Sequence, residues 1–200
     1  LMGGYSSERH ISVESGRNVY EKLSSSVKYK PIPVFLTGNN KASRIFQIPI
    51  NIMLKDHADD IREKILHFKL HPVIKEIKEK TLSVTKKYGS ESSIQKPISL
   101  SFKDLSCIVD GVFIALHGRP GEDGVVQREL IQEGIPYNGS NPESSSLTID
   151  KFKTNEVLKT NGHSVAKHFI VEKKEWINNK KAITSKLENE IHFPLIAKPV

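Results

Sequence analysis

The chain has 200 residues, 37% of them hydrophobic and 26% charged, which is typical of a globular protein with one domain and part of a second. Its single cysteine, Cys107, excludes an internal disulfide and is expected in the core, and no apolar run approaches the roughly 18 residues of a membrane span. The net charge of +7 comes from lysines scattered along helical patterns, whereas residues 104–150 hold two basic and eight acidic residues. Because scattered lysines usually form a solvated face, we expect no nucleic-acid partner. From the lack of a membrane span and the single cysteine we expect no membrane partner and a cytoplasmic location.

The first element in chain order is a glycine-rich turn, residues 3–8, which follows what reads as the end of a strand. A helix then runs to about Leu23, with Ile11, Val19 and Leu23 on one face and Ser15 between them. Strand, glycine-rich turn and helix in this order are typical of a ligand-binding βα unit, whose backbone N–H groups face the ligand.

Glu8 lies in or just before the first turn of this predicted helix. A carboxylate there complements the helix dipole, and position alone favours that role. Binding of a cationic group above the sheet is the alternative.

A second strand is predicted at residues 31–36, with its prolines at the start, where a lost donor is tolerated. The next region, about 40–103, carries no recognisable site and reads as a helical elaboration. It contains an amphipathic helix ended by Pro72, a second helix at 73–82 and a polar loop at 89–93.

The most informative stretch begins with the apolar run Val112 to Leu116, which is typical of a strand covered on both faces of a parallel sheet. It stops at His117, and three glycines and a proline follow within residues 118–124. Ligands of open α/β sheets bind outside the carboxyl ends of the strands, so this turn is the leading candidate for a site. A helix at 125–133 follows, with Val126, Leu130 and Ile131 on its expected buried side.

The rest of the chain continues as alternating strands and helices. Lys198 stands in an otherwise apolar run, and an unpaired buried ammonium is costly. An anionic ligand would explain it, and so would an edge position from which the side chain reaches water; both remain open. The predicted elements are a strand at 134–137, a helix at 151–160, a strand at 165–171, a helix at 176–187 and a strand at 193–200.

Several separate segments together resemble one family, the D-alanine–D-alanine ligases of the ATP-grasp superfamily. The resemblance covers nearly the whole chain except about 40–103, which is longer than the typical family region. The segments that carry it, in order, are residues 3–8, Ile11-Ser12, Ser15-Gly16, 115–118, 121–124, Gln127, 135–137, Gly139-Ser140, Asp150-Lys151 and 197–199.

The resemblance implies a fold and a domain division. The expected fold class is α/β, with a doubly wound, mainly parallel sheet followed by a truncated α+β ATP-grasp subdomain. Residues 1–147 would form the N-terminal substrate-binding domain, and residues 148–200 would begin the central ATP-grasp domain.

The resemblance also implies a reaction, in which ATP phosphorylates one D-alanine and the amine of a second D-alanine attacks the acyl phosphate. The dipeptide product would enter peptidoglycan precursors. Matched residue by residue, Glu8 would hold the ammonium of the first D-alanine and is the expected catalytic residue, which overturns the preference from position. His117 and Gly118 would bind the same substrate, and Lys151 and Lys198 would contact ATP phosphates.

The expected partners are D-alanine, ATP and Mg²⁺ or Mn²⁺, and a homodimer stays open. The metal ligands of the family would lie beyond residue 200, so this segment alone is expected to be inactive. The acidic pair Glu122 and Asp123 is expected to bond loop N–H groups rather than to react.

Three alternatives remain beside this interpretation. A ligase joining D-alanine to D-lactate or D-serine would share these motifs, and a silent ATP-grasp relative would bind without ligating. A generic dinucleotide-binding module is disfavoured, since neither Gly-x-Gly-x-x-Gly nor Gly-Lys-Ser/Thr occurs. The ligase interpretation requires the Glu8 turn and the His117 turn to emerge at the same edge of one sheet.

Overall fold

The computed structural model describes residues 1–88, 94–191 and 193–198, so the loop predicted at 89–93 lies outside the described residues. The chain divides into two compact units, Leu1–Pro142 and Glu143–Val200. Within the described residues, none of the helices has the length and apolar character needed to cross a lipid bilayer.

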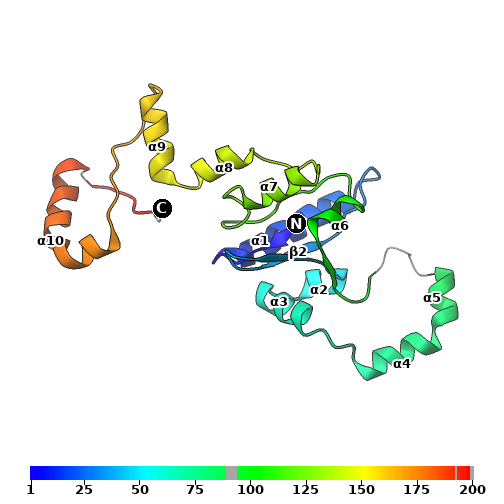
Figure 1. Cartoon of the computed structure of the whole chain (residues 1–200). Helices are drawn as coiled ribbons and strands as arrows, with labels where there is room; N and C mark the ends of the chain where they lie inside the picture. The colour runs from blue at the N-terminus through cyan, green and yellow to red at the C-terminus, as the bar shows by residue number, and fades with distance from the viewer. Residues whose placement is uncertain (89–93, 192, 199–200) are drawn as a thin grey trace. The chain divides into compact units, whose positions relative to one another are not determined.

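The first unit is built on a mixed sheet with the strand order β1-β2-β3-β4 (Figure 1). The first pair of strands is parallel, and the other two pairs are antiparallel. Two of these strands, β3 and β4, lie in the region where only helices were expected. The strands are β1 (Met2–Gly3), β2 (Val34–Gly38), β3 (Ser43–Gln47) and β4 (Ile98–Leu100).

The apolar run Val112 to Leu116 lies beside β1, on the side away from β2. The N–H of Ala115 donates to the carbonyl of Leu1 over 2.9 Å, and Val112 pairs with Tyr137 in an isolated parallel bridge. The strands predicted at 112–116 and 134–137 are therefore present only as extended segments joined by one bridge.

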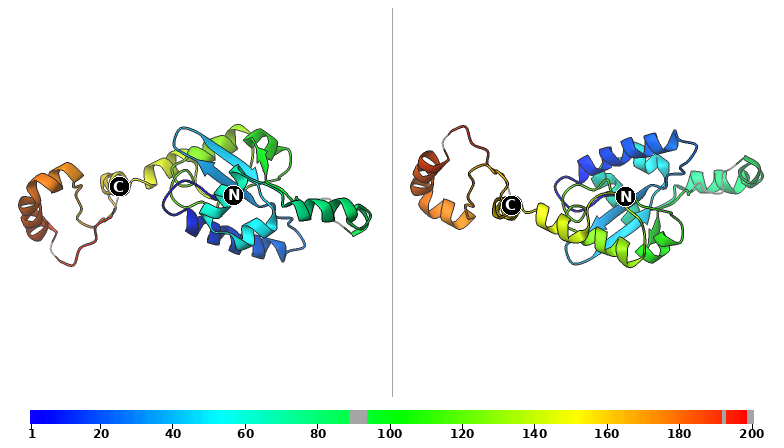
Figure 2. Two further views of the ribbon diagram at one scale, coloured as in Figure 1. Left: turned by 90° about the horizontal axis from the view of Figure 1, so that it is seen from below. Right: turned by 90° about the horizontal axis from the view of Figure 1, so that it is seen from above.

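Helices cover both faces of the sheet. Figure 2 shows α1 (Arg9–Ser24) and α7 (Val125–Gln132) on opposite faces. One core cluster includes Val13 of α1, and the other includes Val126 of α7. The α/β fold class with helices on both faces is thereby confirmed, but the sheet is mixed rather than mainly parallel, because β3 follows β2 through a short turn and must run antiparallel to it.

The central strand β2 supplies side chains to both clusters, since successive residues of a strand point to opposite faces. Phe35 packs in the cluster with α1, while Val34 and Leu36 pack in the cluster with α7. The first cluster also receives side chains from α2 (Ile50–Lys55) and α3 (Ala58–Leu66), and the second from α6 (Phe102–Ser106).

The buried face of α1 differs from the predicted one. Ile11 is 57% exposed, whereas Ser12, Val13 and Gly16 are buried. A Cβ on Gly16 would lie 2.8 Å from the Cβ of Met2, so the absence of a side chain lets β1 approach the helix. The helix is rotated toward its small residues because close helix–strand contact decides its orientation.

Three further expectations differ from the structure. Pro72 begins a helix, as suits a residue without an N–H, and the helix before it already ends at Leu66. Cys107 is exposed, and on α7 the side chain of Ile131 is 53% exposed while Gln127 is buried. Between α3 and β4 the chain forms α4 (Pro72–Lys80) and α5 (Leu82–Tyr88).

The second unit contains helices joined by irregular chain. Helix α8 (Pro142–Thr148) spans the junction of the units, and α9 (Lys151–Thr160) and α10 (Lys173–Glu190) follow. The strands predicted at 165–171 and 193–200 are not formed in the described residues. Neither segment has a neighbouring strand among the residues described, and a strand without a partner leaves its N–H and C=O groups unpaired.

Candidate functional site

Two turns from distant parts of the chain lie side by side at the carboxyl end of β1. The Ser6 hydroxyl donates to the carbonyl of His117 over 2.8 Å and accepts from the N–H of Glu8 over 3.1 Å. One side chain therefore joins the turn at residues 3–8 to the turn that begins at His117. The expectation that both turns emerge at the same edge of one sheet is confirmed.

Ser12 provides a second, buried link between these segments. It is 0% exposed, its hydroxyl donates to the carbonyl of Ala115 over 2.9 Å, and it accepts from the N–H of Gly3 over 2.9 Å. Both hydrogen-bonding directions of a buried hydroxyl are thus satisfied, which fixes α1 against the chain that leads into the His117 turn.

His117 is held from α1 as well. Its Nε2 shares a 2.8 Å hydrogen bond with the hydroxyl of Ser15, and the imidazole is partly buried. Because a ring with one nitrogen so engaged has a fixed orientation, its remaining edge is presented at a defined angle. Ser15 is therefore a positioning residue for His117.

Replacing Ser15 by alanine in the complete protein should raise the KM for the ligand bound beside His117. One net hydrogen bond contributes about 0.5–1.5 kcal/mol, which corresponds to a rise of about 2- to 10-fold. Steady-state kinetics would show this rise with the KM of any second substrate unchanged, and Ser15→Thr should restore it. Ser25→Ala, at the far end of α1, is the matched control; equal rises in all KM values would contradict the positioning role.

Glu8 is the N-cap residue of α1, yet its side chain makes no capping hydrogen bond and is exposed. Its carboxylate lies against Gly118, because a Cβ added to Gly118 would be 3.1 Å from Glu8 Oε2 and 2.9 Å from Ser6 Oγ. Gly118 also has a φ of 67°, which side-chain-bearing residues rarely adopt. Glu8, His117 and Gly118 are thus brought together, with a carboxylate available to a cationic group.

The interior of the His117 turn is held by its own backbone and by one buried amide. The N–H groups of Gly121 and Glu122 both donate to the carbonyl of Gly118 over 2.9 Å. Gln127, 5% exposed, donates from Nε2 to the carbonyl of Gly121 over 2.7 Å. Among described residues its Oε1 is buried without a partner. Gln127 thus fixes the turn from α7.

Replacing Gln127 by glutamate should destabilise the first unit by about 1–3 kcal/mol at neutral pH. An ionised carboxylate cannot donate to the Gly121 carbonyl, and its burial raises its pKa. The protonated carboxyl can donate, so the loss should shrink as pH falls. Chemical denaturation at several pH values measures this effect, with the exposed Gln132→Glu as control; a pH-independent loss would contradict the assigned bond.

The two acidic residues of the turn have different surroundings. Asp123 accepts over 3.1 Å from the N–H of Val125, the first residue of α7, so it has the predicted structural role but bonds a helix N–H rather than a loop N–H. The side chain of Glu122 is exposed. Burial, and next the nearby carboxylate of Asp123, raise the pKa of Tyr5.

The two lysines predicted to meet a nucleotide lie in the second unit. Lys151 is the first residue of α9 and is exposed, and Lys198 is exposed in irregular chain. Beside Lys151, the backbone N–H of Lys153 donates to Asp150 and lowers the pKa of that N-cap carboxyl. Neither Lys151 nor Lys198 has a salt bridge to a described residue, so both ammonium groups are available to an anion.

Sequence reasoning did not assign roles to the serines that build this site. Ser12 and Ser15 lie one helical turn apart, on the side of α1 that faces the sheet edge. Ser6 lies in the turn before the helix. Small hydroxyl residues on an otherwise buried helical face were the available signal. In the part of the chain that the structure describes, no group of three or more His, Cys, Asp or Glu side chains is placed to hold a metal ion.

Comparison with known proteins gives one family and one fold. A family model described as D-ala D-ala ligase N-terminus matches residues 1–140. The chain is 29% identical over 201 residues to a D-alanine–D-alanine ligase of Leptospira interrogans, with 100% of this chain and 49% of that protein covered. The chain thus spans about half the length of the curated relatives it matches.

Solved structures agree in fold. The D-alanine–D-alanine ligase from Coxiella burnetii superposes with a TM-score of 0.55 at 24% identity, over 94% of this chain and 48% of that one. The VanG D-Ala:D-Ser ligase from Enterococcus faecalis gives a TM-score of 0.53 at 20% identity, over 95% and 48%. Both likenesses extend through nearly the whole chain.

Proposed function

The chain belongs to the D-alanine–D-alanine ligase family, and on that premise we propose that the complete protein joins two D-alanines at the expense of ATP. One observation supports the proposal above the others: the Glu8 carboxylate, free of capping bonds, lies against Gly118, in the turn that Ser6 joins to its own through the His117 carbonyl. A small amino acid needs such a carboxylate for its ammonium group.

The roles of the chain's own residues follow from this arrangement. Glu8 binds the ammonium of the first D-alanine, His117 is held by Ser15 at the edge of the same site, and Gly118 leaves room for the substrate. Holding a small zwitterion in one orientation lowers the entropy cost of reaction. Glu8 neutralises the ammonium and need not transfer a proton.

ATP, when bound, would supply the phosphoryl group that activates the substrate carboxylate. We propose that Lys151 and Lys198 meet its phosphates, and their exposed, unpaired ammonium groups suit that role. Mg²⁺ has no cluster of ligands among the described residues, and its ligands are proposed to come from the remainder of the protein. Residues 1–147 are proposed as the substrate-binding domain and 148–200 as the start of the ATP-grasp domain, acting in the cytoplasm.

The test is phosphate release from ATP by the complete protein with D-alanine, L-alanine, D-lactate or D-serine. Release should require D-alanine, and the dipeptide should form in equal amount. Release that needs no D-alanine would overturn the proposal. D-Lactate or D-serine used together with D-alanine in preference to a second D-alanine would assign the protein to the mixed ligases.

Lys198→Ala in the complete protein should weaken ATP binding by about 10- to 100-fold, because a charge-assisted contact to phosphate contributes about 1.5–3 kcal/mol. Equilibrium binding of ATP measures the effect without turnover. Lys159→Ala, which removes another exposed lysine of the second unit, is the control. Unchanged ATP affinity would show that Lys198 is a solvated side chain with no part in ATP binding.

A further inference from the structure

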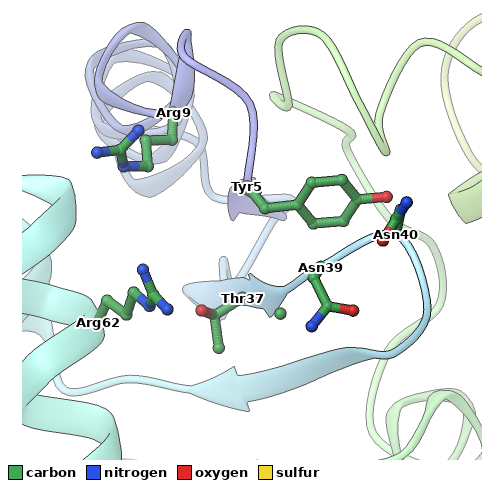
Figure 3. Close-up of a pocket in the computed structure, with 8 residues that line it drawn as sticks. Tyr5, Arg9, Thr37, Asn39, Asn40 and Arg62 are labelled. Carbon is green, nitrogen blue, oxygen red and sulfur yellow. The ribbon is translucent and has the colours of Figure 1, made fainter.

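A hollow of about 370 Å³ opens beside the carboxyl ends of β1 and β2, and none of the predicted site residues lines it. Its size falls in the range of small-molecule sites, and its place is where open α/β sheets bind ligands. Figure 3 shows the side chains around it, which come from the turn before α1, from α1 and α3, and from the end of β2 and the turn after it. The lining includes Tyr5, Arg9, Thr37, Asn39, Asn40 and Arg62.

Two arginines face this hollow, and they differ in their pairing. Arg9 donates to both carboxylate oxygens of Asp59, over 2.8 and 3.0 Å, and this hydrogen bonding lowers the pKa of Asp59. His10 lies 3.3 Å from the same carboxylate. Arg62 has no hydrogen bond or salt bridge to a described residue. Its charge acts on Asp59 only at a distance and helps to lower the pKa of that carboxyl, so its guanidinium N–H groups are the unpaired donors at the hollow.

The hydroxyl of Thr37 faces the same space. Thr37, at the end of β2, is 4% exposed, and its hydroxyl has no hydrogen-bond partner among the described residues. Figure 3 shows the Arg62 guanidinium reaching from α3 toward this hydroxyl. Thr37 lines the hollow, and its hydroxyl is not among the buried side-chain atoms that lack a partner, so water reaches it there. A ligand in the hollow would replace that water as its hydrogen-bond partner.

Asn39 adds a donor to the same rim. Its Oδ1 accepts from the backbone N–H groups of Lys41 and Ala42, over 2.9 and 3.1 Å, which fixes the side chain and leaves its amide hydrogens available. Guanidinium, hydroxyl and amide donors around one cavity match an oxyanion, and a guanidinium binds such a group through two parallel hydrogen bonds.

We propose that this hollow is a second ligand site, which binds a small molecule through a carboxylate or phosphate group held by Arg62 and Thr37. The site is separate from the Glu8 site, because it is lined by other residues and recognises an anion rather than an ammonium. The proposal does not depend on the ligase reaction.

The test is titration of the complete protein with inorganic phosphate and, separately, with acetate, at constant ionic strength in chloride. The amide resonances of Thr37 and Gly38 should shift and saturate. Saturation by phosphate alone would assign a phosphoryl ligand, by acetate alone a carboxylate ligand, and by both a site for either group. No saturable shift with either probe up to about 20 mM would overturn the proposal.

Matched variants locate the binding. Arg62→Gln and Thr37→Val should each weaken the titrated affinity by about tenfold or more, whereas Thr37→Ser keeps the hydroxyl and should retain it. Arg128→Gln removes another exposed arginine, on α7, and should have no effect. An affinity for phosphate or acetate that is unchanged by Arg62→Gln would contradict the proposed role of Arg62 in this site. Because binding is read without turnover, failure here is distinct from failure of the ligase assignment.

Discussion

Replacement of Glu8 by glutamine in the complete protein should raise the KM for D-alanine by about 10- to 100-fold, with the KM for ATP unchanged. Glutamine keeps the size of the side chain and removes the charge that would neutralise the substrate ammonium. The side chain has no hydrogen bond to the described protein, so its loss leaves no buried partner unpaired. The effect should therefore appear in substrate binding and leave thermal stability nearly unchanged.

Initial rates at varied D-alanine and varied ATP separate the two KM values. Glu21→Gln, an exposed glutamate on the same helix, is the matched control and should leave both unchanged. If Glu8→Gln raised both KM values equally, or lowered stability without affecting D-alanine, the carboxylate would have a structural role at the helix N-terminus.

Gly118→Ala should lower the free energy of unfolding by about 1–3 kcal/mol and raise the D-alanine KM by at least about tenfold. The backbone at φ 67° disfavours any side chain, and the new Cβ would lie 2.9 Å from Ser6 Oγ and 3.1 Å from Glu8 Oε2. Those two atoms must move, and their movement displaces the carboxylate that would bind the substrate and disturbs the Ser6 link between the turns.

Gly134→Ala separates the two causes of this effect. Gly134 has the same φ of 67°, and a Cβ there would meet nothing within 4 Å. Its alanine variant should lose stability from backbone strain alone and keep the D-alanine KM. Denaturation curves and kinetics of both variants make the comparison. A Gly118 variant that behaves like the Gly134 variant would show that close approach to Glu8 is unimportant.

The helices could be predicted largely from local sequence. The predicted helices at 125–133 and 151–160 are found as α7 and α9, and the helix after Glu8 is found as α1. Helical hydrogen bonds join residues four apart, so the apolar period within one segment is sufficient to indicate them. The buried face of α1 could not be predicted in this way, because it depends on the close approach of Met2 at Gly16.

Strands were predicted less well, since their partners are remote in sequence. The strand β3 pairs with β2 and β4 within a region that reads as helical, while 165–171 and 193–198 are apolar but unpaired in the described residues. An apolar run does not say whether a neighbouring strand exists to accept its hydrogen bonds.

The sequence by itself determined the α/β class, the family, and the two polar turns at which chemistry is expected. Only the tertiary structure decided that those turns touch, through Ser6, Ser12 and Ser15, and that Arg62 and Thr37 share a separate hollow. The physical reason is sequence distance: contacts such as Ser6 with His117 span 111 positions, and no local pattern encodes them until strand pairing brings the segments together.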